Sequence, residues 1–169
     1  MKITSQEEYG LRCLLQIARA NGESLTIPEI AASEGLSAAY VGKLLAILRH
    51  AGLIDSVRGR SGGYRLAAPA AEIGLSRVLK ALGEPLYGAP SFCERHAGSE
   101  TDGECVHLSG CTLRTLWLTL EHWIGQLLDQ ITLADLIQNE DDLAEVLRTR
   151  LSEILNSQTA PLLSLKLTN

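Results

Sequence analysis

Apolar side chains recur every three or four positions along the first part of the chain, the spacing that puts them on one face of an α-helix. The pattern predicts three helices there, with buried stripes such as Leu11, Leu14, Leu15 and Ala18 in the first and Val41, Leu44, Leu45 and Leu48 in the third. We expect the first helix to start near Thr4 or Ser5 and to end at Asn21-Gly22, the second to run from Thr26 to Gly35, and the third from Ser37 to about His50.

Polar residues at the expected helix ends agree with these limits. Both Thr4-Ser5-Gln6-Glu7 and Ser5-Gln6-Glu7-Glu8 fit the capping box, in which a hydroxyl and a carboxylate satisfy opposing backbone N–H groups. The stretch Thr26-Ile27-Pro28-Glu29 fits the same pattern at the start of the second helix. Gly35 suits the tight turn that follows, because glycine adopts a positive φ without strain.

The periodicity changes after the third helix. Residues 53–57 and 64–66 predict two short strands around the turn Arg58-Gly59-Arg60-Ser61-Gly62-Gly63. Two helices joined by a tight turn and followed by such a hairpin make residues 25–66 a winged helix–turn–helix, which holds one helix in the major groove of DNA. The fold class is therefore expected to be mainly α with a small β-wing.

The second half of the chain is again helical. After a short helix at residues 75–82, residues 84–110 contain four Gly and two Pro without clear periodicity, and we expect a loop there. A long amphipathic helix is predicted from about Thr112, and it needs an apolar partner, for which a second copy of the chain is the economical choice. A last helix at residues 141–156 is expected to turn Leu143, Val146, Leu147, Leu151, Ile154 and Leu155 inward.

These elements divide the chain into four parts. We predict a winged helix–turn–helix DNA-binding domain at 1–83, a cysteine-bearing cluster loop at 84–110, a dimerisation helix at 111–137 and a C-terminal helical extension at 138–169. The formal net charge is −5, but residues 1–90 hold 10 Lys and Arg against 8 Asp and Glu, while residues 91–169 hold 5 against 12. The basic groups therefore lie in the part that is expected to read DNA.

The sequence lacks the features of membrane proteins, secreted proteins and hydrolases. No apolar run is long enough to span a bilayer and the first residues lack the apolar stretch of a signal peptide, so we expect a cytoplasmic protein with no membrane partner. Gly59-Arg60-Ser61-Gly62-Gly63 matches the G-x-S-x-G pattern of hydrolases, but a strand follows where that motif requires a helix. With no other catalytic set of residues in the chain, we do not expect an enzyme.

The third helix and the hairpin carry the candidate DNA contacts. Ser37, Tyr40 and Lys43 lie near the start of the helix, opposite its apolar stripe, where recognition helices reach base edges and phosphates. Arg58 and Arg60 lie in the wing, and Arg58 is the candidate for insertion into a narrow minor groove. The alternatives are an ordinary solvated helix face and a basic surface hairpin.

Three cysteines form the second candidate site. Cys93, Cys105 and Cys111 are separated by eleven and five residues in the expected loop, whereas Cys13 lies beside the apolar face of the first helix and is expected in the core. Clustered thiols in the cytosol favour metal or redox chemistry over structural disulfides, and thiolates suit an iron–sulfur cluster or zinc. The alternative is three unconnected thiols. The candidates for a fourth ligand are Glu8, His107 and His96.

Several strings of residues together resemble one known family. They are Glu8-Tyr9-Gly10-Leu11-Arg12, Ala39-Tyr40-Val41, Leu48-Arg49-His50-Ala51-Gly52-Leu53, residues 56–66 of the wing, and Thr132-Leu133-Ala134-Asp135-Leu136. On these strings the chain resembles the Rrf-type family of winged-helix transcription regulators, which includes the IscR and NsrR iron–sulfur sensors. The likeness covers roughly residues 1–136, and the wing string is the most specific to the family.

The resemblance implies a homodimer with a long dimerisation helix and three cysteine ligands before it, matching Cys93, Cys105 and Cys111. The gap after Cys93 is longer than is usual in the family. In some members a carboxylate near the start of the first helix, supplied by the partner subunit, is the fourth ligand, and Glu8 stands at that position. Other members use a His just after the third Cys, where this chain has Arg114. The family's acidic residue in the recognition helix is Gly42 here, so base preference is expected to differ.

The sequence thus predicts a dimeric, DNA-binding transcriptional regulator, with repression the favoured sign, whose affinity for a double-stranded operator is controlled by an iron–sulfur cluster. A 2Fe–2S cluster is favoured over a 4Fe–4S cluster, and the signal is redox state, nitric oxide or iron and cluster supply. One alternative is a cluster-free winged-helix regulator that uses thiol redox chemistry or zinc. An alternative from another class is an iron–sulfur carrier or redox protein, for which the basic wing has no use.

Overall fold

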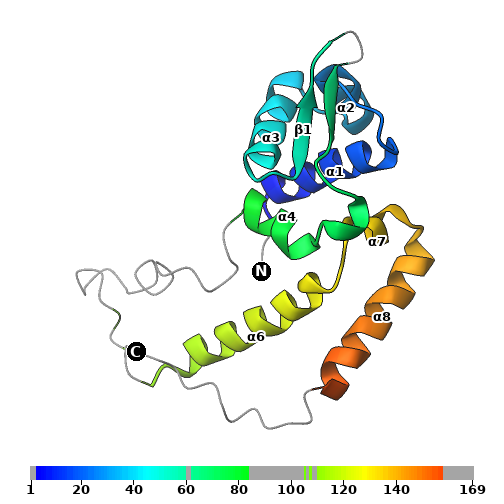
Figure 1. Ribbon diagram of the computed structural model, residues 1–169. Helices are drawn as coiled ribbons and strands as arrows, with labels where there is room; N and C mark the ends of the chain where they lie inside the picture. Colours follow the sequence, from blue (N-terminus) through cyan, green and yellow to red (C-terminus); the bar gives the residue numbers. More distant parts are fainter. Residues whose placement is uncertain (1–2, 60–61, 84–104, 106, 108–109, 158–169) are drawn as a thin grey trace.

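The computed structural model describes residues 3–59, 62–83, 105, 107 and 110–157. It is mostly helical, with a two-stranded antiparallel sheet (Figure 1). The elements in chain order are α1 (Ser5–Arg19), α2 (Ile27–Glu34), α3 (Ala38–His50), β1 (Ile54–Val57), β2 (Gly63–Leu66), the 3-10 turn η1 (Ala70–Glu72), α4 (Leu75–Leu82), α6 (Thr112–Asp129), α7 (Leu133–Ile137) and α8 (Glu140–Ser157). The mainly α fold with a β-wing is as predicted.

The three N-terminal helices pack around one apolar core. Its largest fully buried side chains come from all three helices and from the start of the hairpin, and include Leu14, Ile17, Ile30, Leu44, Leu45, Leu48, Leu53 and Ile54. Burying each such aliphatic side chain contributes about 1.5–3 kcal/mol. This set therefore dominates the stability of the winged helix–turn–helix unit, residues 3–83, which is called the reader below. The predicted stripe of the third helix is therefore confirmed as core, and in the first helix Leu14 and Ala18 are buried while Leu11 and Leu15 are partly buried against the core.

The helix ends follow the predicted caps. The Thr4 hydroxyl accepts a hydrogen bond from the Glu7 backbone N–H, and the Glu7 carboxylate accepts one from the Thr4 backbone N–H. The two bonds form a capping box at the start of α1. Thr26 and Glu29 do the same for α2, and the Ser37 hydroxyl accepts from the Tyr40 N–H at the start of α3. Of the two boxes that the sequence allowed at the first helix, the structure thus uses Thr4 with Glu7.

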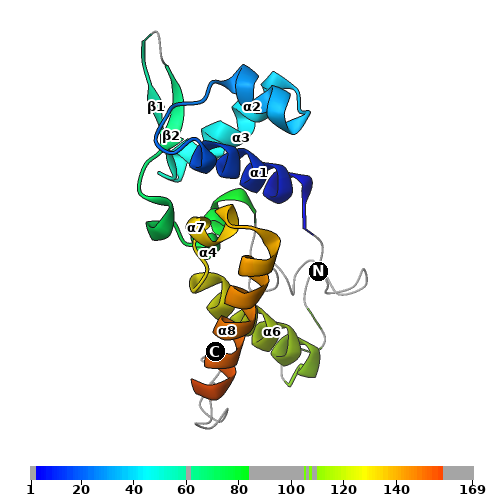
Figure 2. The ribbon, with the colours of Figure 1, turned by 90° about the vertical axis from the view of Figure 1, so that its right-hand side faces the viewer.

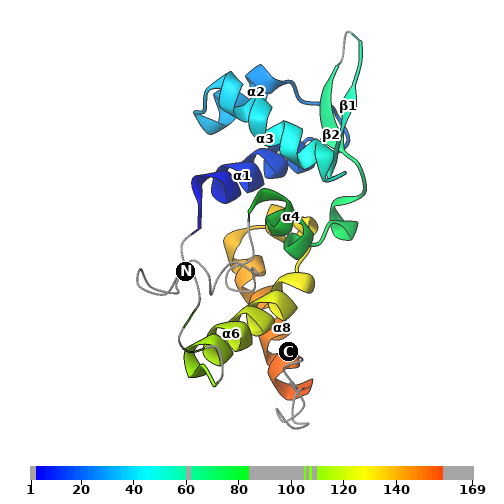
Figure 3. The same ribbon diagram turned by 90° about the vertical axis from the view of Figure 1, so that its left-hand side faces the viewer.

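The wing follows directly on α3. In the sheet, Ile54 pairs with Leu66 and Val57 with Gly63 in antiparallel register. Tyr64 also exchanges two backbone hydrogen bonds with Leu25, of 2.8 and 2.9 Å between N and O, which tie the wing to the segment before α2. In all three ribbon views the hairpin points away from α6 and α8 (Figures 2 and 3).

The predicted long helix is shorter than expected, and a second helix follows it. α6 ends at Asp129, and Thr132 with Asp135 forms a new capping box that starts α7. Ile131 and Leu133 are 2% and 0% exposed, and their backbones bond to Leu75 and Ile73 at the start of α4. The end of the predicted dimerisation helix is therefore part of the structure that supports the reader.

The last helix, α8, packs on α6 and α7 and begins one residue before its predicted start (Figure 1). Ile154 is buried as expected, but Leu151 and Leu155 are 46% and 57% exposed. The prediction that these two leucines face inward was wrong, because the contacts of α8 with α6 and α7 leave this part of its apolar stripe uncovered within one chain.

No single helix among the described residues is long and apolar enough to cross a membrane. Only together are α2 and α3 long and apolar enough to span a bilayer, and their axes are bent by 112° at the turn between them. Their most apolar side chains, among them Ile30, Leu44 and Leu45, are the core of the reader.

Candidate nucleic-acid interface and thiol site

The start of α3 presents a polar surface beside the wing. Ser37 and Lys43 are exposed, as the sequence predicted, although the Ser37 hydroxyl is already used by the Tyr40 N–H at 3.3 Å. Ala38 and Ala39 are small and exposed, so a DNA backbone can approach this turn closely. The N-terminal turn of a helix also favours phosphate through its free N–H groups. The surface is thus suited to a groove of DNA.

Tyr40 differs from this expectation. Its side chain is half-buried, and its ring packs edge-on against Tyr9 of α1, with 6.2 Å between ring centroids and 83° between planes. Edge-to-face pairs of this kind stabilise beyond their buried area. Part of the Tyr40 side chain therefore belongs to the core, and only the exposed remainder is available to DNA.

Residues of α1 and α2 that the sequence analysis missed support the turn before α3. The Arg12 guanidinium lies 5.5 Å from the Tyr9 ring centroid and its Nε donates to the Glu34 carboxylate at 2.6 Å. The Glu34 side chain is only 6% exposed and also accepts from Gln16 at 2.6 Å. The hydrogen bond and charge of Glu34 raise the pKa of Arg12 above its usual value. No local pattern signals this pair, because its members are 22 residues apart.

The wing carries an exposed Arg58 at the end of β1, as predicted, while Arg60 lies outside the described residues. Gly63 permits a close approach, since a Cβ there would lie 2.6 Å from the Leu25 carbonyl oxygen. A Cβ at Gly62 would likewise meet backbone oxygen, that of Gly59, at 2.8 Å. The two glycines are therefore required by the shape of the hairpin that holds Arg58.

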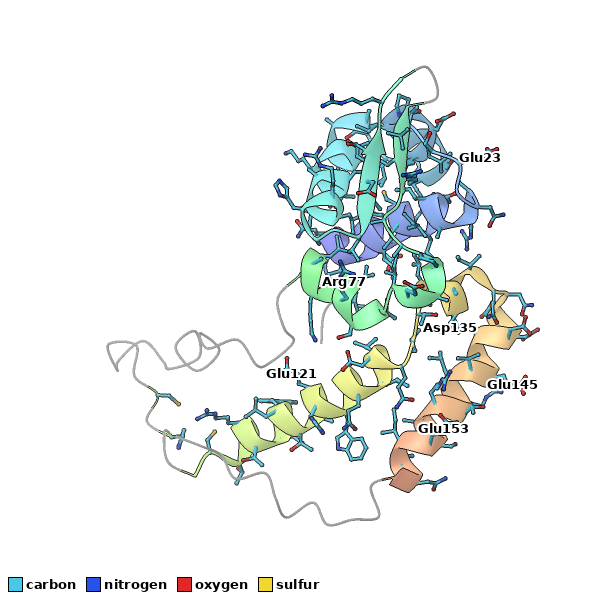
Figure 4. All side chains as sticks on the ribbon, in the orientation of Figure 1. Glu23, Arg77, Glu121, Asp135, Glu145 and Glu153 are labelled. Carbon is cyan, nitrogen blue, oxygen red and sulfur yellow. The ribbon has the colours of Figure 1, made fainter. Side chains whose placement is uncertain are left out.

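Charge is unevenly distributed between the two ends of the structure. Lys43, Arg58 and Arg65 are exposed on the reader, whereas Glu145 and Glu153 lie on α8 and Glu121 on α6, at the far end (Figure 4). An anionic polymer such as DNA is attracted to the first end and repelled by the second. The charge distribution thus favours the approach of such a polymer at the end that carries α3 and the wing.

The thiols fall into two kinds. Cys13 is fully buried in the reader core, as predicted, and burial raises its pKa to about 11. Cys105 and Cys111 are free thiols of intermediate exposure. Cys111 is the N-cap of α6, and its sulfur accepts the Arg114 N–H at 3.4 Å. Cys93 and His96 lie outside the described residues, and His107 is exposed.

Glu8 is available as a ligand in the structure. The capping box of α1 uses Glu7, so the Glu8 carboxylate is not needed for the cap and is exposed on the first turn. Within the described part of one chain, no three His, Cys, Asp or Glu side chains come together as a metal site. One copy does not bring Glu8, Cys105 and Cys111 together.

The chain is similar to known transcriptional regulators over most of its length. The model of the Rrf2 family, described as "Iron-dependent Transcriptional regulator", matches residues 3–139. The Rrf2 protein of Nitratidesulfovibrio vulgaris is 37% identical over 140 residues, which are 82% of this chain and 89% of that protein. The IscR protein of Vibrio atlanticus is 33% identical over 142 residues, which are 83% of this chain and 78% of that protein, and it is named an HTH-type transcriptional regulator and not an enzyme.

Two solved structures share the fold. One is CymR, the global cysteine regulator of B. subtilis, with a TM-score of 0.64, 27% identity and coverage of 81% of this chain and 96% of that one. The other is IscR of T. potens, with a TM-score of 0.62, 26% identity and coverage of 95% and 93%. The fold of these structures agrees with the family match over residues 3–139. The chain therefore belongs to the Rrf2 family of transcriptional regulators.

Proposed function

We propose that this regulator acts in the cytoplasm as a homodimeric repressor whose hold on a double-stranded operator is controlled by an iron–sulfur cluster. The observation that carries the DNA part is the exposed start of α3 beside a glycine-shaped wing that presents Arg58. A helix in the major groove with an arginine in the adjacent minor groove reads one half-site. Two copies then read a two-fold symmetric operator.

The helix α6 supports the dimer. It contains Leu, Trp and Ile at helical spacing, yet none of its described side chains is buried within one chain. Leu113, Leu116 and Leu120 are 60%, 47% and 40% exposed and lie within two turns of one another. An exposed apolar stripe on a helix is typical of a protein–protein interface, and a two-fold pairing of α6 would cover it.

The donor set suits an iron–sulfur cluster by its chemistry. Cys105 and Cys111 are free, partly exposed thiols and Glu8 is a free carboxylate, so soft thiolate ligands and one harder oxygen are present. Cys105, Cys111 and Cys93 of one chain, with Glu8 from the second copy, would hold the cluster. When bound, such a cluster supplies a site that responds to oxidants, nitric oxide or iron supply.

Ligation by Glu8 of α1 would couple the state of the cluster to the position of α3. An oxygen ligand binds a thiolate-preferring cluster more weakly than a fourth Cys, so it is the first to be released. Because Glu8 lies one residue before Tyr9, which packs on Tyr40, its release changes the first turn of the helix that supports α3. We propose that this shift lowers operator affinity.

A cluster-free regulator is the second candidate. The structure of CymR, described as a cysteine regulator, has the same fold. In this chain Cys105 and Cys111 are two free, partly exposed thiols close in sequence, and they would serve a thiol-based switch as well.

The decisive experiment is anaerobic purification of the full chain, with a visible spectrum, iron and sulfide assays, and footprinting on operators selected from random DNA. We expect visible absorption with matched iron and sulfide, a dimer by sedimentation, and a footprint on a two-fold symmetric site. Arg58→Ala should weaken the footprint without changing the visible spectrum. Glu8→Ala, in a chain that keeps Arg58, should change the visible spectrum.

The outcomes separate the parts of the proposal. A colourless protein after reconstitution, still with a footprint, supports the thiol or zinc regulator. An unchanged cluster in Glu8→Ala removes Glu8 as the ligand. A protein that carries a cluster but binds no DNA sequence in any cluster state is a carrier, and the regulator proposal is then wrong.

A further inference from the structure

Arg77 of α4 makes a contact that its place in the sequence does not suggest. Its Nη2 donates to the carbonyl oxygens of Ala51 at 2.9 Å and of Gly52 at 3.0 Å. These two carbonyls lie at the end of the recognition helix α3, where the chain turns into the wing. Figure 4 shows Arg77 on α4, just below that end of α3.

At the end of α3, the backbone carbonyls of Ala51 and Gly52 are the groups that Arg77 bonds. Gly52, at φ +66°, donates to the Arg49 carbonyl and Leu53 donates to the Leu48 carbonyl, each at 3.0 Å, which is a Schellman ending. Ala51 and Gly52 still present their carbonyls outward, at the negative end of the helix dipole. A guanidinium that bonds both carbonyls satisfies the polar groups and the dipole together.

The helix that carries Arg77 is itself fixed to the second half of the chain. Leu75 donates to the Ile131 carbonyl and Leu133 donates to the Ile73 carbonyl, each at 2.8 Å, so the start of α4 is bonded to the segment between α6 and α7. Arg77 follows Leu75 by two residues. A short path of direct hydrogen bonds therefore runs from the end of α6, through α4, to the end of α3.

We propose that Arg77 is a positioning residue that sets the angle of the recognition helix relative to α6, and thereby the spacing of the two half-sites that a dimer reads. The inference rests on the proposed dimeric reading of DNA. In a two-fold dimer built on α6, the separation of the two recognition helices depends on how each α3 is held against its own α6. Val78 and Leu82 of α4 share the core with α3, and Arg77 adds hydrogen bonds to the last carbonyls of α3.

The test compares the half-site spacing that each variant prefers. Wild type, Arg77→Ala, Arg77→Lys and Lys80→Ala are equilibrated with duplexes that carry two selected half-sites, with the spacer varied in steps of one base pair. A duplex with a single half-site measures reading by one copy. Lys80 is the matched control, because it is an exposed cation one turn further along α4. Melting temperature and sedimentation verify folding and dimerisation.

We expect wild type to prefer one spacing. Arg77→Ala should lose on the order of tenfold in affinity for that spacing, about the contribution of one hydrogen bond to a charged group, and should bind neighbouring spacings almost equally. Its affinity for the single half-site should change little. Arg77→Lys, whose ammonium can still donate to a carbonyl, should recover part of the preference, and Lys80→Ala should keep it fully.

A structural role alone would lower the affinity for every duplex by the same factor, with the preferred spacing unchanged, and that result overturns the inference. The same applies if Lys80→Ala relaxes the spacing as much as Arg77→Ala. If wild type itself has no preferred spacing, the proposed dimeric reading fails and the inference with it. Should Arg77→Ala not fold, Arg77→Gln takes its place, with an intermediate loss of preference expected.

Discussion

Replacing Gly63 by Ala should separate the wing from the rest of the reader. A Cβ at this position would lie 2.6 Å from the Leu25 oxygen, 2.7 Å from the Leu25 carbonyl carbon and 3.1 Å from the Thr26 nitrogen. Non-bonded heavy atoms are most favourable at about 3.5–4.0 Å, so the two segments must move apart by roughly 1 Å. All three atoms are backbone, and no side-chain rotation can relieve the contact.

The cost follows from two terms. Forcing an extra carbon into a filled space costs about 1–3 kcal/mol. The movement also lengthens the two hydrogen bonds between Leu25 and Tyr64, now 2.8 and 2.9 Å, and each contributes about 0.5–1.5 kcal/mol. Together these give a loss of about 2–6 kcal/mol in the free energy of unfolding. At about 2–4 °C per kcal/mol for a chain of this size, Tm should fall by about 4–24 °C.

Thermal unfolding followed by circular dichroism measures the loss, and operator footprinting measures its effect on the wing. Gly74→Ala is the matched control, because Gly74 has φ −71° and no atom within 4 Å of its ideal Cβ. Gly74 is the N-cap of α4, so the control should lose at most about 1 kcal/mol and keep the footprint, whereas Gly63→Ala should lose both stability and the footprint. A Tm for Gly63→Ala within 2 °C of wild type would refute the steric reasoning.

Two further predictions concern ionisable groups. Cys13 should resist iodoacetamide at neutral pH while Cys105 and Cys111 react, because burial raises its pKa to about 11; digestion and mass spectrometry would show equal labelling if the burial were wrong. The pKa of Glu29 is lowered by hydrogen bonds from the Thr26 side chain and backbone. The stability from this cap is therefore present above the ordinary pKa of a glutamate and is lost as pH falls through the lowered pKa. Glu29→Ala should therefore have a lower Tm than wild type at pH 7 and approach it in acid, and a difference independent of pH would contradict this account.

Much of the reader could be predicted because its determinants are local. The caps at Thr4, Thr26 and Ser37 act over three or four residues, and the apolar stripes have the helical period. The capping box at Thr132 and Asp135 was equally visible in the sequence, and it would have ended the predicted dimerisation helix at its observed end. That error arose because the apolar period of α6 continues to Ile131, and periodicity alone does not register a cap.

The candidate site was predictable only in its residue types. Arg58, Lys43 and Glu8 are exposed as their chemistry requires, and Cys13 is in the core. The half-burial of Tyr40 against Tyr9 was not predictable, because the contact joins two helices whose crossing is set by packing.

The sequence by itself therefore determined where the three N-terminal helices begin and end, the basic wing, and the presence of clustered thiols, since these depend on neighbours along the chain. Only the tertiary structure decided which glutamate is free of the cap, which leucines stay exposed, and that Arg77 meets the end of α3. The physical reason is distance along the chain. Arg77 and Ala51 are 26 residues apart, and such a pair is joined only when the core fixes how α4 lies against α3.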